Sequence, residues 1–312
     1  MNQSRAVTEG AIFAGIYIVL LFITVFVPLL SIISIILLPI PFVIYTYRYG
    51  VKYASIMFIA TLLITMIVAT VFSLPTTILM GLGGMSLGWA LNEGKGTYET
   101  WARGAIGFSL GLGFVYVITQ FVFEINWTEE IREMIDNSLE TSINLFTQFG
   151  YELDEASINL LTEQMQSYLY LIPTGIVIFG VLLAFLTLWI SYKIINRLEN
   201  KSYRFPKFRD FKLPNSLIWY YLAGIILVWI FTDPSETMYL VAINLYTLTG
   251  LLLVLQGISF MFFFTHYKKW SKAIPIILLV LLFIYPVLLL YPMRILGIID
   301  LGFQLRERLN KS

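Results

Sequence analysis

The chain has 312 residues, 58% of them hydrophobic and 12% charged, with a mean hydropathy of +0.81 and a formal net charge of +1. It contains no cysteine and one histidine, His266, which excludes disulfides, thiolate nucleophiles, zinc–thiolate centres and paired-histidine metal sites. We therefore expect no cofactor, no metal and no nucleic-acid partner. The composition predicts an all-α polytopic membrane protein.

The first 91 residues predict four membrane-spanning helices in two hairpins. A span needs about 20 apolar residues, and the run from Gly10 to Leu91 contains only two basic residues, Arg48 and Lys52. We expect the chain to reverse near Pro28 and again near Pro75, because proline ends one helix and can open the next. Arg48 and Lys52 then lie between the two hairpins.

The rest of the chain predicts further spans, which makes a helical bundle of about eight to ten in all. They are Gly104–Phe123, Tyr168–Tyr192, the short Ser216–Phe231, the long Met238–Phe264 and a ninth candidate, Ala273–Tyr291. A short leg, Met293–Phe303, is predicted to follow a hinge at Tyr291 and Pro292. Because this leg contains Arg294 and Asp300, we expect it to be re-entrant or interfacial.

Charge distribution predicts the orientation. The stretch 125–167 has one basic residue, Arg132, against nine acidic ones, so it is predicted to be external, with both termini cytoplasmic. The sequence of 125–167 also predicts an amphipathic helical hairpin between the fifth and sixth spans. Asn126 and Glu129 fit a capping box, Gly150 ends the first helix, and Asp154 starts a second. The hairpin could pack on the outer helix ends, cover an outward-facing pocket or meet a partner.

Three regions are predicted: a six-helix membrane domain over 1–192, a basic cytoplasmic linker over 193–214, and C-terminal membrane helices with a cytoplasmic tail over 215–312. The linker carries seven basic residues against Glu199 and Asp210. That charge is either a topology signal alone or also a docking surface for a cytoplasmic partner or anionic lipid headgroups.

Small residues at helical spacing predict close helix contacts. The first span carries four of them near its predicted cytoplasmic end, and they are Gly10, Ala11, Ala14 and Gly15. They fit either packing inside the chain or docking of another membrane protein. Two further stripes, Gly81 with Gly84 and Gly88, and Gly104 with Gly107 and Gly111, predict close packing of the fourth and fifth spans.

One polar cluster is a candidate ligand site. Tyr116, Gln120, Glu124 and Trp127 are spaced to form one helical face that climbs to the outer surface. We expect Gln120 to act as a bidentate amide, Glu124 as a charge partner and the aromatic rings as stacking surfaces for a small molecule. The alternative is an interfacial aromatic belt. Asn244 and Gln256 are predicted to bond between helices, and no catalytic constellation is found in the sequence.

The chain resembles a known family along most of its length. The opening TEGAIFAGIYIVLLF, the basic pair Arg48 and Lys52, the long acidic external loop and the closing LGIIDLGFQLRERL resemble the YybS-like family of Gram-positive membrane proteins. The first six spans are similar to the substrate-binding S components of energy-coupling-factor transporters. That likeness implies six helices, and an AxxxA pattern on the first helix that contacts a membrane coupling subunit. Here Ala11 and Gly15 occupy that spacing, and the chain continues beyond the sixth span.

Two function classes follow. The first is a solute-binding or transport-associated membrane subunit that depends on a separate ATPase, because the chain has no Walker motif. The second is a membrane scaffold or regulatory subunit that recruits protein partners. For the first class, the partner, a coupling subunit or ATPase, is expected at the first helix and the 193–214 linker. For the second class, the basic cytoplasmic linker and the acidic external hairpin recruit partners and nothing is transported. We expect no enzymatic activity.

Overall fold

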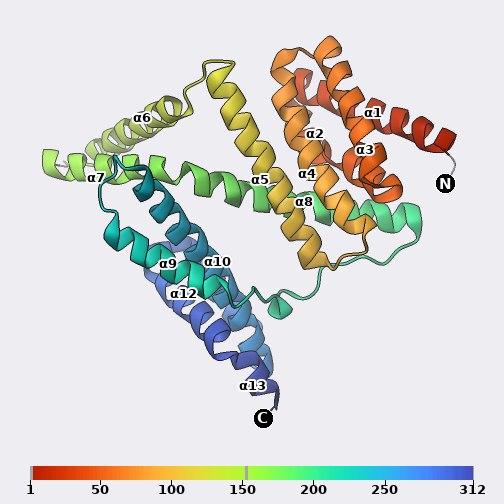
Figure 1. The fold of residues 1–312 in the computed structure, drawn as a ribbon. Helices are drawn as coiled ribbons and strands as arrows, with labels where there is room; N and C mark the ends of the chain where they lie inside the picture. The colour runs from red at the N-terminus through yellow and green to blue at the C-terminus, as the bar shows by residue number, and fades with distance from the viewer. Residues whose placement is uncertain (1–2, 152–153, 312) are drawn as a thin grey trace. The chain divides into compact units, whose positions relative to one another are not determined.

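The structure is a computed structural model that describes residues 3–151 and 154–311. The described residues form α-helices joined by short 3₁₀ turns and loops, with no strand among them (Figure 1). The chain separates into two compact units, residues 1–169 with 175–205, and residues 170–174 with 206–312. The second boundary falls inside the predicted linker, and Lys193–Phe205 belongs to the first unit.

The first unit is built from six helices and a helical hairpin. The six helices are α1 (Gln3–Phe26), the short α2 (Pro28–Leu37), α3 (Ile40–Val68), α4 (Leu74–Asn92), α5 (Thr97–Phe121) and α8 (Ile172–Glu199). α4 lies against both α3 and α5, and α1 lies against α2 and α3.

α3 contains a reversal that the sequence predicted between Arg48 and Lys52. Gly50 has φ 78° and ψ 174°, which interrupts the helix. The rings of Phe42 and Phe58 lie 5.9 Å apart, whereas 16 residues of straight helix would separate them by about 24 Å. The two halves of α3 therefore run back along each other, and the predicted turn is confirmed. Glycine suits this position because φ is positive there.

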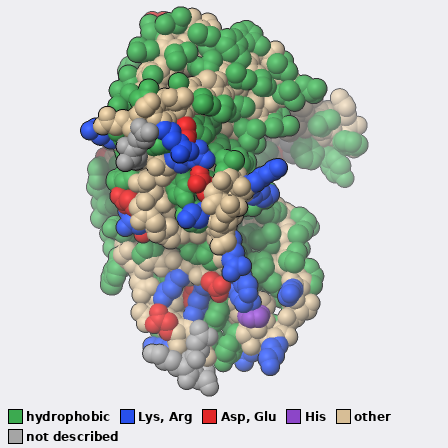
Figure 2. Space-filling model, turned by 90° about the vertical axis from the view of Figure 1, so that its right-hand side faces the viewer, with side chains coloured by type: hydrophobic (Ala, Val, Ile, Leu, Met, Phe, Trp, Pro, Cys, Tyr) green, Lys and Arg blue, Asp and Glu red, His purple; other side chains and the backbone are tan. Residues whose placement is uncertain are grey.

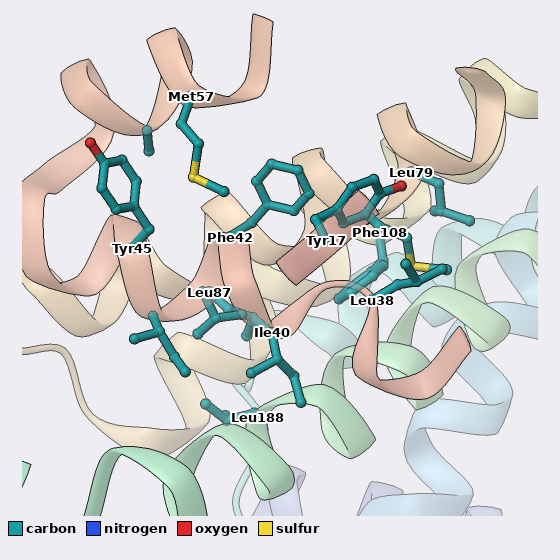
Figure 3. Packing of buried hydrophobic residues seen from close by; sticks show 14 of the residues in the cluster. Tyr17, Leu38, Ile40, Phe42, Tyr45, Met57, Leu79, Leu87, Phe108 and Leu188 are labelled. Atoms are coloured by element: carbon teal, nitrogen blue, oxygen red, sulfur yellow. The ribbon is translucent and has the colours of Figure 1, made fainter. Parts of the chain in front are cut away.

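The core of the first unit lies where α1, α3, α4, α5 and α8 meet (Figure 3). Tyr17, Phe42 and Phe108 are fully buried there. The Tyr17 hydroxyl donates to Thr77 Oγ1 at 2.9 Å, so its polar end is satisfied inside the bundle. The predicted close packing of α4 and α5 is confirmed, because a Cβ on Gly111 would lie 2.9 Å from the Leu79 Cα.

The predicted helical hairpin forms α6 (Trp127–Gln148) and α7 (Glu155–Ser167). The Asn126 side chain accepts from the amides of Thr128 and Glu129, and Gly150 ends the helix with φ 81°. Asp154 caps α7 by accepting from the Ser157 amide, and hydrogen bonding from the Ser157 side chain, followed by that amide, holds the pKa of the Asp154 carboxyl below its usual value. Both predicted helix starts are confirmed.

The second unit packs around its longest helix. It contains α9 (Leu217–Ile230), α10 (Thr237–Tyr267), α11 (Ala273–Ile284), α12 (Pro286–Phe303) and α13 (Leu305–Lys311). α10 and α12 run parallel, since Gly250 meets Arg294 and Gln256 meets Asp300. At their crossing, a Cβ on Gly257 would overlap the Met293 carbonyl oxygen.

The C-terminal hinge is not where the sequence placed it. The prediction of a hinge at Tyr291 and Pro292 is wrong: Pro292 lies inside α12, and the chain breaks at Tyr285. Tyr285 has φ −125° and ψ 63°, because a residue that precedes proline is pushed out of the helical region. Pro286 then opens α12. The short leg is therefore α11, about 18 Å long, rather than Met293–Phe303.

The predicted class, an all-α polytopic membrane protein, is confirmed. Seven helical segments of the described residues are long and apolar enough to cross a membrane. One of them, Pro28–Val68, reverses at Gly50 and so consists of two stretches that run back along each other. α9 and α11 are shorter apolar helices of 14 and 12 residues. Hydrophobic side chains cover most of the visible surface, and charged ones gather in a few places (Figure 2).

Candidate functional site

The four residues of the predicted ligand site do not share one helical face. α5 ends at Phe121, and Glu124 is exposed in a left-handed conformation with φ 57°. Trp127 opens α6, and its indole N–H donates to Thr119 Oγ1 at 2.6 Å. The expected geometry is wrong because it extended one helix through the loop. Tyr116 and Gln120 remain one turn apart on α5, and ligand binding at the four residues stays a prediction.

The small residues of α1 divide into an inward and an outward pair. Gly10 and Ala14 are buried against α3. A Cβ on Gly10 would lie 2.8 Å from the Tyr45 hydroxyl oxygen, and that hydroxyl donates to the Ala6 carbonyl at 2.9 Å. This pair therefore packs inside the first unit.

The outward pair, Ala11 and Gly15, is exposed. A Cβ on Gly15 would meet nothing within 4 Å. Its apolar neighbours on the same side, Ile12, Ile16 and Val19, are 56%, 44% and 59% exposed. Another helix could therefore approach the α1 backbone closely between these larger side chains. We call the five residues the outward face of α1.

An ion cluster occupies the end of the first unit next to this face. Arg48 lies 2.9 Å from Glu9 Oε2 and 2.6 Å from Glu199 Oε1, and Arg5 lies 3.0 Å from Glu9 Oε1. The side chains of Arg48, Glu9 and Glu199 are 26%, 18% and 31% exposed. They border an open cavity of about 570 Å³, with Asn92 and Lys201 on its rim. α1 thus carries both the outward face and part of a charged concavity.

Sequence reasoning missed this cluster. It used Arg48 as a topology signal and as part of the family resemblance, and the partners of Arg48 are 39 and 151 residues away in the chain. No local pattern links residues at such separations. The one usable signal was the presence of Glu9 inside the first turns of an otherwise apolar span.

The second unit holds an arginine surrounded by tyrosines. The Arg294 guanidinium lies 5.5, 5.2 and 5.3 Å from the ring centres of Tyr221, Tyr246 and Tyr291. Its Nη1 donates to the hydroxyls of Tyr221 at 3.2 Å and Tyr246 at 2.9 Å. Within the described chain, Nε is buried without a hydrogen-bond partner. Cation–π contacts and phenol oxygens take the place of a carboxylate.

A second polar network is buried between α10, α12 and α13. Asp300 Oδ2 accepts from Gln256 Nε2 at 2.5 Å and from Arg306 Nε at 2.9 Å. Arg306 also donates to the carbonyls of Arg209 and Phe211 at 2.8 and 2.9 Å. The network therefore fixes the 3₁₀ turn Phe208–Asp210 on the helices. The predicted interhelical role of Gln256 is confirmed, and that of Asn244 through its bonds to Thr174 and Tyr170.

Comparison with known proteins identifies the family. A family model described as "Predicted membrane protein (DUF2232)" matches residues 15–301. The chain belongs to the DUF2232 family. It is also 30% identical over 309 residues to the "Uncharacterized protein YybS" of Bacillus subtilis (strain 168), with 99% of each chain covered. The resemblance to the YybS-like family is confirmed. No solved structure matches the chain.

Within the DUF2232 family match lie Arg48, Glu199, Arg294 and Asp300, all of which form polar contacts here. From the sequence, Arg294 and Asp300 were used only to predict that Met293–Phe303 does not span the membrane. Their position in an apolar segment was itself the signal, because an ionisable side chain in a membrane helix needs a partner inside the protein.

Proposed function

We propose that this DUF2232 protein is a transport-associated membrane subunit that has no ATPase of its own and performs no catalytic step. It docks against a membrane coupling subunit through the outward face of α1. The observation that carries the proposal is the division of the α1 stripe, in which Gly10 and Ala14 pack inward while Ala11 and Gly15 stay open.

Packing physics favours a helix as the occupant of this face. In a bilayer the hydrophobic effect does not drive helices together, so close van der Waals packing at small residues is a main source of association. The open space above Gly15 gives a partner backbone room to approach, and Ile12, Ile16 and Val19 border that space. The AxxxA-like spacing of Ala11 and Gly15 matches what the S-component likeness implies.

The ion cluster supplies the second half of the interface. We propose that the N-terminus and this end of the first unit are cytoplasmic, as the positive-inside rule predicts. A cytoplasmic segment of the coupling subunit then enters the cavity of about 570 Å³ and meets Arg48, Glu9 and Lys201. Charges at such a rim contribute mainly to orientation and association rate.

Gly15→Leu is expected to disrupt the complex without unfolding the chain. The added side chain enters open space in the isolated protein, yet it holds a partner helix away from the backbone. We expect at least a tenfold loss of the high-molecular-weight species on native gels of mildly solubilised membranes from the native host. The melting temperature of the purified chain should stay within about 2 °C.

Gly113→Leu is the matched control, because a Cβ there also meets nothing within 4 Å and the residue lies on α5. It should leave the complex intact. Equal behaviour of the two variants, whether both keep or both lose the large species, contradicts docking at the outward face of α1.

Single cysteines test the orientation on which this proposal rests. We expect a cysteine at Glu133 to react with a membrane-impermeant maleimide added to intact cells, and one at Lys201 to react only after permeabilisation. The chain has no native cysteine to add background. Labelling of position 201 alone in intact cells reverses the assignment.

A further inference from the structure

A second cavity lies at the end of α10 in the second unit. Its volume is about 660 Å³, and it is bordered by the 3₁₀ turn Phe208–Asp210, the last turns of α10 and the start of α11. The histidine lies near lysine and arginine side chains on this part of the surface (Figure 2). We call it the α10–α11 cavity.

The rim of the α10–α11 cavity is basic. The lining side chains that carry or can carry positive charge are Lys207, Arg209, His266, Lys269 and Lys272, and none of the lining residues is acidic. Beside the rim, the Asp210 carboxylate lies 3.7 Å from Arg209 Nε. Such a rim favours an anionic group.

The walls of the cavity are apolar. They are formed by Phe208, Phe262, Trp270, Pro275 and Ile276. Trp270 and Ile276 are 54% and 53% exposed, and Ile277 and Val280 continue an exposed apolar strip along α11. A free phosphate compound would gain nothing from these walls. A molecule with an anionic head and a hydrocarbon tail matches both the rim and the strip.

The cavity is held in shape by buried contacts rather than by its ligand. The Phe208 ring packs edge-on against Phe262 at 5.8 Å, and Ser259 Oγ lies 2.8 Å from the Phe208 carbonyl oxygen. Arg306 donates to the Arg209 carbonyl at 2.8 Å. Because one wall is fixed in this way, little ordering remains to oppose binding.

We propose that the α10–α11 cavity binds the phosphate headgroup of an anionic phospholipid, with the acyl chains lying along α11. The site is separate from the proposed docking face on α1, because every lining residue belongs to the second unit. Basic residues near a membrane surface attract anionic lipid, and aromatic side chains such as Trp270 favour the headgroup level.

The test is lipid binding by the full-length protein in a neutral detergent, read by native mass spectrometry. Phosphatidylglycerol should bind at least tenfold more tightly than phosphatidylcholine with the same acyl chains. Lys269→Asn with Lys272→Gln should weaken phosphatidylglycerol binding about thirtyfold, since each basic residue at a membrane surface contributes about fivefold. Asparagine suits position 269 because its φ is 55°.

Lys193→Gln with Lys268→Gln is the control, because it removes the same charge from residues that do not line the cavity. It should weaken binding less than threefold. Glycerol 1-phosphate and inorganic phosphate, added at millimolar concentration, should not displace the lipid. Equal binding of the two lipids, equal loss in the two double variants, or displacement of the lipid by either soluble phosphate overturns the proposal.

Discussion

Asp300→Asn is expected to lower the free energy of unfolding by about 3–5 kcal/mol, the cost of removing one partner from a buried ion pair. The Asp300 and Arg306 side chains are 1% and 9% exposed, and Nε lies 2.9 Å from Oδ2. Asparagine keeps the shape but removes the buried negative charge that pairs with Arg306 Nε. Unfolding in mixed micelles with increasing sodium dodecyl sulfate measures the loss.

A surface pair in the same region is the control for Asp300→Asn. Lys212 and Glu307 lie 2.7 Å apart, but their side chains are 35% and 51% exposed. Glu307→Gln should therefore cost less than about 1 kcal/mol. Amide exchange in residues 207–213 should quicken in Asp300→Asn only, because Arg306 holds that segment by its carbonyls. Similar losses in both variants would show that burial does not strengthen the Asp300 pair.

Gly257→Ala is expected to destabilise the second unit by about 3 kcal/mol or more, at the upper end of overpacking effects. A single methyl group there would overlap the Met293 carbonyl oxygen, and Gly297 meets the Leu253 carbonyl oxygen in the same way. Since both obstacles are backbone atoms, no side-chain rotation relieves the clash, and α10 and α12 must separate. The same micelle titration measures this loss.

Gly302→Ala is the matched change on α12. A Cβ at Gly302 lies 3.6 Å from Ile218 Cδ1, an ordinary contact. Alanine raises the helix propensity at both positions, by up to about 1 kcal/mol in a helix interior, so a loss of stability in Gly257→Ala alone reports the crossing of α10 and α12. If Gly257→Ala is as stable as Gly302→Ala, α10 and α12 do not cross at these glycines.

The helices could be predicted from the sequence because their causes are local. Apolar runs set the spans, Gly50 and the caps at Asn126 and Asp154 set turns and helix starts, and each of these acts over a few residues. The end of α5 gave no such signal, since neither glycine nor proline occurs between Phe121 and Trp127. Glu124 takes the left-handed conformation there, although glutamate is not one of the residue types that favour it.

The hinge and the candidate site depended on tertiary contacts. Both Pro286 and Pro292 could have broken the last span, and the choice was settled by packing of Met293 and Gly297 on α10. The ion cluster around Arg48 joins three segments far apart in the chain. The spacing of the small residues on α1 correctly predicted a close helix contact. Which pair of them points inward depends on the position of α3.

The tyrosine-lined position of Arg294 has a consequence for biogenesis. Arg294 packs on Gly250, which lies roughly 20 and 26 Å along α10 from its two ends at about 1.5 Å per residue. An arginine at the centre of a helix costs about 2.5–3.5 kcal/mol to insert, and α12 carries Asp300 as well. By itself, α12 is therefore expected to insert poorly into the membrane. We therefore expect α12 to enter the bilayer only after α9 and α10, whose Tyr221 and Tyr246 hydroxyls accept hydrogen bonds from Arg294.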